Sequence, residues 1–180
     1  MRTVLNVSAS AMLALIAASG YALAQGATNP EARLKEKNIT LPQAPSPFYN
    51  YVNAVQVGNL LFLSGNTPYA PGGWKFKGKV GKDLTVQEGY DTARQVGLIM
   101  LAEVRDALGS LDRVKRVVKV LGMVNSADGF VDQPRVINGF SDLMVDVFGE
   151  AKGKHARSAV GVAGLAVNSA VEVEMIIEVE

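Results

Sequence analysis

Apolar and polar residues alternate with period two along the last ten residues of the chain, a pattern typical of a half-buried β-strand. Five apolar side chains fall on one face: Val171, Val173, Met175, Ile177 and Val179. The opposite face receives four glutamates and one isoleucine: Glu172, Glu174, Glu178, Glu180 and Ile176. Ile176 indicates that this second face is partly covered. We therefore expect Glu172 and Glu174 to be half-buried, and such a carboxylate must find a donor or have its pKa raised.

Two helices are predicted by apolar residues that recur every three or four positions. The first follows the capping box Thr85-Val86-Gln87-Glu88 and continues until Gly109, a residue that commonly ends helices. The second is opened by Pro134 and stops at Gly149.

The remaining segments predict strands and one short helix. Residues 52–57 and 60–64 form a hairpin around Gly58-Asn59, a pair suited to a two-residue turn. Further strands are expected over these ranges: 74–80, 114–124, 157–163 and 170–179. Asn29-Pro30 can cap and open a short helix through residue 36. This order predicts an α+β fold, a mixed sheet with two helices packed on one face.

The first 24 residues have the layout of a secretory signal peptide. Arg2 precedes an apolar stretch at 4–18, and Ala22-Leu23-Ala24 offers a cleavage site. The alternative is an uncleaved membrane anchor, which polar and glycine residues within the stretch disfavour. We expect an exported protein, periplasmic in a Gram-negative host, with an N-terminal extension or tether at 25–47 and one domain at 48–180.

Composition excludes several kinds of site. The 180 residues contain no cysteine and one histidine, so thiol nucleophiles, disulfides and Cys- or His-rich metal sites are not expected. Lys and Arg number 18 against 17 Asp and Glu. Because Arg2 is the only charged residue of the leader, the rest of the chain is formally neutral. It lacks the basic footprint of a nucleic-acid-binding protein.

Arg157 is a lone guanidinium at the head of an apolar strand. It either forms an ion pair with one of the C-terminal glutamates or binds a carboxylate ligand, for which its planar fork is suited. His155, two residues earlier, is expected to be a loop residue rather than a catalytic base. The segment 73–79 imitates a phosphate-binding loop, but Val80 follows where Mg²⁺ binding needs Ser or Thr. We therefore interpret it as a surface hairpin.

Three segments resemble the Rid/YjgF family of reactive-intermediate imine deaminases. Leu63-Ser64-Gly65-Asn66-Thr67-Pro68 is similar to the family's SGQ-x-P motif, and the helix around Asn138 is similar as well. Ala156-Arg157-Ser158-Ala159-Val160 is followed, 15 residues after the arginine, by Glu172. The resemblance covers about residues 46–180. It implies a chorismate-mutase-like fold assembled as a homotrimer around a β-barrel, with clefts at the subunit interfaces.

The resemblance also implies a reaction: hydrolysis of a 2-imino acid, or its enamine tautomer, to a 2-oxo acid and ammonia without cofactor or metal. Arg157 would hold the substrate carboxylate, and Glu172 would orient the attacking water or transfer its proton. The substrate-binding residues would be Tyr51, Ser64, Gly65, Asn138 and Ala159. The chain departs from the family at Tyr49-Asn50-Tyr51, which stands in place of Gly-Pro-Tyr, and in a longer segment at 71–84.

Two other functions stay open. A non-catalytic protein with the same trimeric cleft would bind small carboxylates such as 2-oxo acids, or act as an interaction protein. Ribonuclease activity has been attached to the wider family, and the neutral body of this chain disfavours it.

Overall fold

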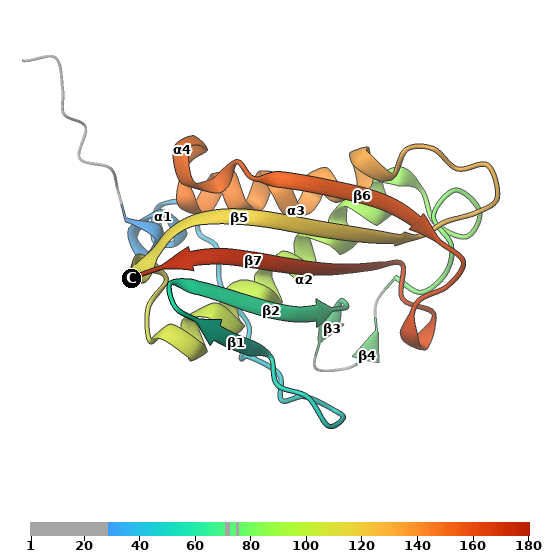
Figure 1. Cartoon of the computed structure of the whole chain (residues 1–180). Helices are drawn as coiled ribbons and strands as arrows, with labels where there is room; N and C mark the ends of the chain where they lie inside the picture. Colours follow the sequence, from blue (N-terminus) through green and yellow to red (C-terminus); the bar gives the residue numbers. More distant parts are fainter. Residues whose placement is uncertain (1–28, 71–72, 75) are drawn as a thin grey trace, which may run out of the picture.

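The computed structural model describes residues 29–70, 73–74 and 76–180 (Figure 1). The predicted signal peptide at 1–24 and the first residues of the predicted tether lie outside this part. Within the described residues, no helix combines the length and apolar character needed to cross a bilayer.

The described residues form four α-helices, two 3₁₀ helices and seven strands. The helices are α1 (Pro30–Glu36), α2 (Val86–Leu108), η1 (Leu111–Arg113), α3 (Gln133–Phe148), α4 (Glu150–Gly153) and η2 (Ala166–Asn168). The strands are β1 (Ala54–Val57), β2 (Leu60–Asn66), β3 (Tyr69–Ala70), β4 (Gly73–Trp74), β5 (Val114–Asn125), β6 (Ala156–Val162) and β7 (Val171–Val179).

Five strands form one mixed sheet in the order β1-β2-β7-β5-β6. Only β5 and β6 pair in parallel; the other neighbours are antiparallel. Helices α2 and α3 pack on one face, behind the sheet in Figure 1. The predicted α+β fold, a mixed sheet with two helices on one face, is confirmed.

Local signals account for the ends of α2. Thr85 Oγ1 accepts the Glu88 backbone N–H at 3.2 Å, and Glu88 Oε2 accepts the Thr85 N–H at 2.8 Å, which completes the predicted capping box. Gly109, with φ 81°, ends the helix in the left-handed conformation that glycine adopts without strain.

The predicted strand at 74–80 is much shorter than expected. It reduces to β4, which pairs with β3 in a separate two-stranded ribbon, and to single bridges at Lys77 and Val80. Phe76 and Gly78 have φ angles of 62° and 125°. Because an extended strand requires negative φ, these two residues interrupt it.

The two faces of the sheet differ. All five apolar residues of the β7 alternation are buried against the helices, as predicted. No described helix covers the other face, which lies in front in Figure 1. Four apolar side chains that are 40% to 63% exposed share this face by strand register: Val55, Val57, Phe62 and Val160. Apolar side chains that gather on one exposed face are a common feature of interaction surfaces.

The N-terminal segment packs on the body of the fold. Leu34 of α1 belongs to the hydrophobic core and is 3% exposed. The segment 42–48 then lines hollows along the second half of α2, and Gly65 and Asn66 of β2 line one of these hollows as well.

Candidate functional site

The guanidinium of Arg157 is held by neutral acceptors. Its Nη1 donates to Asn138 Oδ1 at 2.8 Å and to Ser141 Oγ at 2.9 Å, and its Nη2 lies 3.4 Å from the Pro134 carbonyl. Positions 134, 138 and 141 are spaced by four and three residues, so they lie on one stripe of α3. Arg157 lies along this stripe because its β6 position pairs with the buried Val120 and therefore faces the helices.

No carboxylate forms a salt bridge with Arg157 among the described residues. The alternative that Arg157 pairs with a C-terminal glutamate is therefore wrong for the single chain. Burial lowers the pKa of Arg157 and Asp142 opposes this effect, but a guanidinium remains charged at neutral pH. The site thus contains a half-buried positive charge that is fixed in place and not neutralised.

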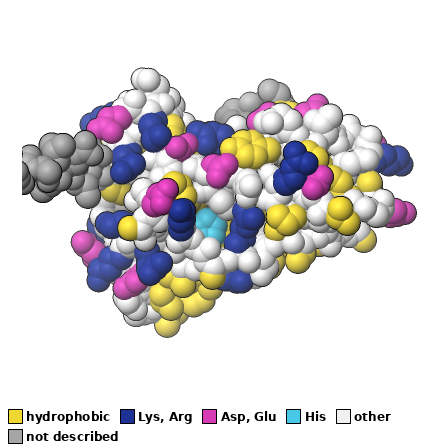
Figure 2. Space-filling view, turned by 90° about the horizontal axis from the view of Figure 1, so that it is seen from above, with side chains coloured by type: hydrophobic (Ala, Val, Ile, Leu, Met, Phe, Trp, Pro, Cys, Tyr) yellow, Lys and Arg dark blue, Asp and Glu magenta, His cyan; other side chains and the backbone are white. Residues whose placement is uncertain are grey.

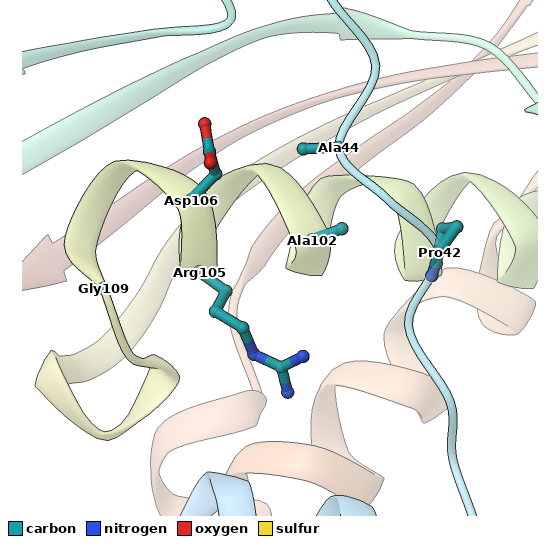
Figure 3. A pocket seen from close by; sticks show the side chains of 6 residues that line it. All are labelled: Pro42, Ala44, Ala102, Arg105, Asp106 and Gly109. Atoms are coloured by element: carbon teal, nitrogen blue, oxygen red, sulfur yellow. The ribbon is translucent and has the colours of Figure 1, made fainter.

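Arg105 provides a contrast within the same molecule. Its Nε and Nη2 donate to the two carboxylate oxygens of Glu31 at 3.0 and 2.6 Å. Figure 3 shows that Arg105 and Asp106 leave opposite sides of α2. Both line a hollow with a volume of about 370 Å³. Because the charge of Arg105 is already compensated, this hollow offers no anion site comparable to that at Arg157.

The hollow beside Arg157 has a volume of about 400 Å³. Six residues line it: Ser141, Asp142, Val145, Lys154, His155 and Arg157. Three of them carry basic groups, and Asp142 is the only acidic residue in this set, so the hollow favours an anionic ligand.

Glu172 lines a different and larger groove of about 730 Å³. Its lining combines aromatic, small and acidic residues: Phe48, Tyr49, Tyr51, Ser64, Gly65, Thr67, Ala166, Val167, Glu172 and Glu174. The β2–β7 register shifts between Leu63 and Asn66, so an irregularity of the bulge type lies at the groove. A Cβ atom at Gly65 would overlap the Glu172 carboxylate, so any larger residue here would displace that carboxylate.

Burial raises the pKa of Glu172, and the neighbouring carboxylate of Glu174 raises it further. This outcome was predicted for Glu172, whereas the same prediction is wrong for Glu174, which is exposed rather than half-buried. A carboxylate whose pKa is raised is a better proton acceptor, which suits general-base chemistry.

The structure sorts the predicted site residues into two groups. Tyr51, Ser64 and Gly65 line the groove with Glu172, and the Ser64 hydroxyl donates to the Val52 carbonyl at 2.7 Å. Asn138 lies with Arg157.

Ala159 does not line either hollow in the single chain. It pairs with Gly122 on the helix side of β6 and packs against the core.

Arg157 and Glu172 do not meet within one chain. Arg157 pairs with Val120 and Glu172 with Met123, so β5 separates them by three positions along its length and by its own width. Standard strand spacings then place their Cα atoms roughly 14 Å apart. Their side chains also point to opposite faces, because Val120 is buried against the helices whereas Met123 faces the uncovered side.

Sequence reasoning missed two participants. Ser141 bonds both Arg157 and His155. Glu103 of α2 is 3% exposed and accepts a hydrogen bond from Asn66 Nδ2 at 2.7 Å. Ser141 could have been found from its helical spacing from Asn138. No sequence signal marked Glu103, because its burial depends on tertiary contacts such as that with Asn66.

The fold and these two groups of residues define a class of protein. Its fold is a mixed five-stranded sheet with helices on one face. Its site combines an arginine on an edge strand, without an ion pair in the described part of the chain, and a half-buried glutamate on the uncovered face. Residues 31–179 match the family described as "YjgF/chorismate mutase-like, putative endoribonuclease". The chain belongs to this family, as the sequence resemblance indicated.

Individual relatives agree with the family. The protein TCP17 of Trypanosoma cruzi is 47% identical over 147 residues, which cover 82% of this chain and 92% of that protein. A Dermatophagoides farinae protein named 2-iminobutanoate/2-iminopropanoate deaminase is 33% identical and covers 79% of this chain and 95% of its own length. The crystal structure of protein Atu1372 of Agrobacterium tumefaciens, of unknown function, is 42% identical, with a TM-score of 0.76 and coverage of 85% and 93%.

Proposed function

We propose that the protein hydrolyses reactive 2-imino acids, or their enamine tautomers, to 2-oxo acids and ammonia, in clefts formed between the subunits of a homotrimer. The observation that carries this proposal is the guanidinium of Arg157, which is fixed by Asn138 and Ser141 and pairs with no carboxylate among the described residues. Such a group is prepared to bind a ligand carboxylate through two parallel hydrogen bonds.

The positions of the two key residues support a cleft between copies. Arg157 lies on β6, which is an edge strand of the sheet, and Glu172 lies in a groove on the uncovered face. A single substrate cannot reach both within one chain. If a second copy covers the apolar face, its edge strand can carry an arginine to this groove, and the exposed Phe62 and Val160 become buried.

The proposed hydrolysis needs no co-reactant other than water. The carboxylate of the substrate binds Arg157, and Glu172 accepts a proton as the water oxygen attacks the imine carbon. The electron pair of the C=N bond moves to nitrogen, to which Glu172 returns this proton. The hydroxyl group then loses its proton to Glu172, which delivers it to the nitrogen, so the C=O bond forms as the C–N bond breaks and ammonia leaves. The imine carbon is already electrophilic, so positioning and proton transfer suffice and no metal or cofactor is required.

The decisive assay measures 2-oxo acid release from imines generated in situ by an amino-acid oxidase. We expect Arg157→Ala to lower kcat/KM by roughly 30- to 5,000-fold, because the substrate carboxylate loses its partner. Arg135→Ala is the matched control: it removes an exposed arginine of α3 that pairs with Asp132. Activity of the wild type no higher than that of Arg157→Ala would refute the proposal.

A non-catalytic binder of small carboxylates is the alternative, since Arg157 would bind such a ligand without turnover. Calorimetry with pyruvate would then show binding that depends on Arg157 in a protein without hydrolase activity. Purified protein that cleaves RNA in a salt-sensitive way would instead support the ribonuclease activity that the family description names.

We also propose that the protein acts outside the cytoplasm after its leader is removed, in the periplasm of a Gram-negative host. Fractionation of expressing cells with N-terminal sequencing of the mature protein tests this proposal, with cleavage after Ala24 as the expected result.

A further inference from the structure

His155 lies in the connection between α4 and β6 and is the only histidine of the chain. Its ring is half-buried and meets Phe140 edge-on, with 6.4 Å between the ring centroids. Both ring nitrogens have hydrogen-bond partners: Nδ1 lies 2.7 Å from the Gly153 carbonyl and Nε2 lies 3.1 Å from Ser141 Oγ. Figure 2 shows the histidine, in cyan, at the surface among basic side chains.

The chemistry of the partners fixes the direction of each hydrogen bond. The Gly153 carbonyl can only accept, so Nδ1 carries the proton. Nε2 of the neutral ring is then an acceptor, and the Ser141 hydroxyl donates to it. Arg157 can only donate, so Ser141 Oγ accepts from Nη1. The three side chains thus form one directed chain that ends at the guanidinium.

We propose that His155 and Ser141 form a positioning relay for Arg157, through which binding of an organic carboxylate at the guanidinium and uptake of a proton by the imidazole are coupled. This inference rests on the proposed role of Arg157 as the carboxylate anchor. His155 does not touch the substrate in this scheme; it acts through Ser141.

The surroundings of His155 set the sign of the coupling. Burial lowers the pKa of His155 and the Arg157 charge lowers it further, whereas the hydrogen bond to Gly153 opposes them, so the ring is neutral at pH 7. An anion bound at Arg157 removes the repulsion between the two cations, which makes protonation of His155 easier. By linkage, the protonated form must bind the anion more tightly.

Other charged groups near the ring are already engaged. Asp142 of α3 accepts the hydroxyl of Tyr90 at 2.9 Å, and Lys154 pairs with Glu150 at 2.8 Å. Arg157 is therefore the charged neighbour whose state changes most when a carboxylate binds.

Protonation also changes what Ser141 can do. With a proton on Nε2, the ring becomes a donor toward Ser141 Oγ, and the serine hydroxyl no longer donates to His155. Oγ can accept from both Arg157 and His155, and its own proton is then free to point toward a bound carboxylate. When His155 is neutral, the relay therefore holds the guanidinium in place. When His155 is charged, the Ser141 hydroxyl can in addition donate to the bound anion.

A single histidine makes the test unambiguous, because its ring signals in an NMR titration need no assignment. We expect saturating pyruvate to raise the midpoint of the His155 titration by about half to one pH unit, and the affinity for pyruvate to increase up to about tenfold as pH falls through this midpoint. In Arg157→Ala, the midpoint without ligand should lie higher than in the wild type, and pyruvate should not move it.

Two pairs of variants separate positioning from a merely structural role. Ser141→Ala and His155→Leu interrupt the relay and should weaken pyruvate binding about tenfold at pH 8, because a hydrogen bond that supports a charged group is lost. Ser141→Thr keeps the hydroxyl, and His155→Gln keeps an acceptor for it, so both should bind with an affinity near that of the wild type. His155→Gln should also abolish the pH dependence, which a structural role would not predict.

The outcomes distinguish this inference from the proposed reaction. If imine hydrolysis is intact but pyruvate leaves the His155 midpoint unchanged, or if Ser141→Ala and Ser141→Thr bind equally, the relay is refuted and the proposed function stands. If pyruvate shifts the His155 midpoint but the protein does not hydrolyse imines, the relay is supported and the proposed reaction is refuted. Absence of both pyruvate binding and hydrolysis refutes both.

Discussion

Glu103 should make the folded protein less stable as the pH rises. Glu103 is 3% exposed, and the one hydrogen-bond partner of its carboxyl group among the described residues is the Asn66 amide. Burial raises the pKa of Glu103 from 4.5 to about 7, although the Asn66 hydrogen bond opposes the change. In the unfolded chain, the same carboxyl ionises near its ordinary value.

The magnitude follows from this difference. Between about pH 4.5 and 7, the folded protein holds a proton on Glu103 that the unfolded chain has released, so stability decreases as pH rises through this window. Each tenfold difference in proton affinity corresponds to about 1.4 kcal/mol, so ionised Glu103 costs about 3 kcal/mol above pH 7. Glu103→Gln keeps the shape and an acceptor for Asn66 but cannot ionise.

Urea denaturation at fixed protomer concentration measures the effect. We expect Glu103→Gln to raise the free energy of unfolding by up to about 3 kcal/mol near pH 8 and to change it little near pH 5. Asp106→Asn, an exposed carboxyl one turn further along α2, serves as the control and should keep the pH dependence of the wild type. An equal effect of Glu103→Gln at both pH values would refute the reasoning, because packing rather than ionisation would then explain it.

Two further predictions concern the proposed cleft. Gly65→Ala places a methyl group where the Glu172 carboxylate lies, so kcat should fall at least about tenfold while Tm, followed by circular dichroism, changes by only a few degrees. Phe62→Glu introduces charge on the uncovered face of the sheet and should convert the proposed trimer to monomers in light scattering; an unchanged particle mass would show that this face is not the interface.

The sequence predicted most of the fold because its strongest signals are local. Period-two alternation fixed which face of β7 meets the helices, and the capping box with Gly109 fixed both ends of α2. The prediction of a strand at 74–80 was wrong because Phe76 has a positive φ angle, which its residue type does not indicate. Such an angle depends on the surroundings rather than on the residue type.

The site was only partly predictable, for a physical reason. Motif resemblance found Arg157 and Glu172, but the partners of Arg157 depend on how α3 crosses β6, which brings Ser141 from 16 residues away. Glu103 resembles an ordinary polar position of an amphipathic helix. Its burial depends on tertiary contacts, since Asn66 of β2 and the segment around Pro47 both lie beside it.

The placement of Arg157 and Glu172 on opposite faces leads to a prediction about mixed assemblies. If each cleft takes its arginine from one copy and its glutamate from the next, Arg157→Ala and Glu172→Gln are each inactive alone but complement each other. In trimers reassembled from equal amounts of the two variants, about a quarter of the clefts combine an intact arginine with an intact glutamate, so about a quarter of the wild-type activity should return. A double variant that carries both changes, mixed with wild type in the same ratio, controls for reassembly. If reassembled mixtures of the single variants stay inactive while this control recovers, both residues act within one chain or not in one site, and a cleft shared between subunits is refuted.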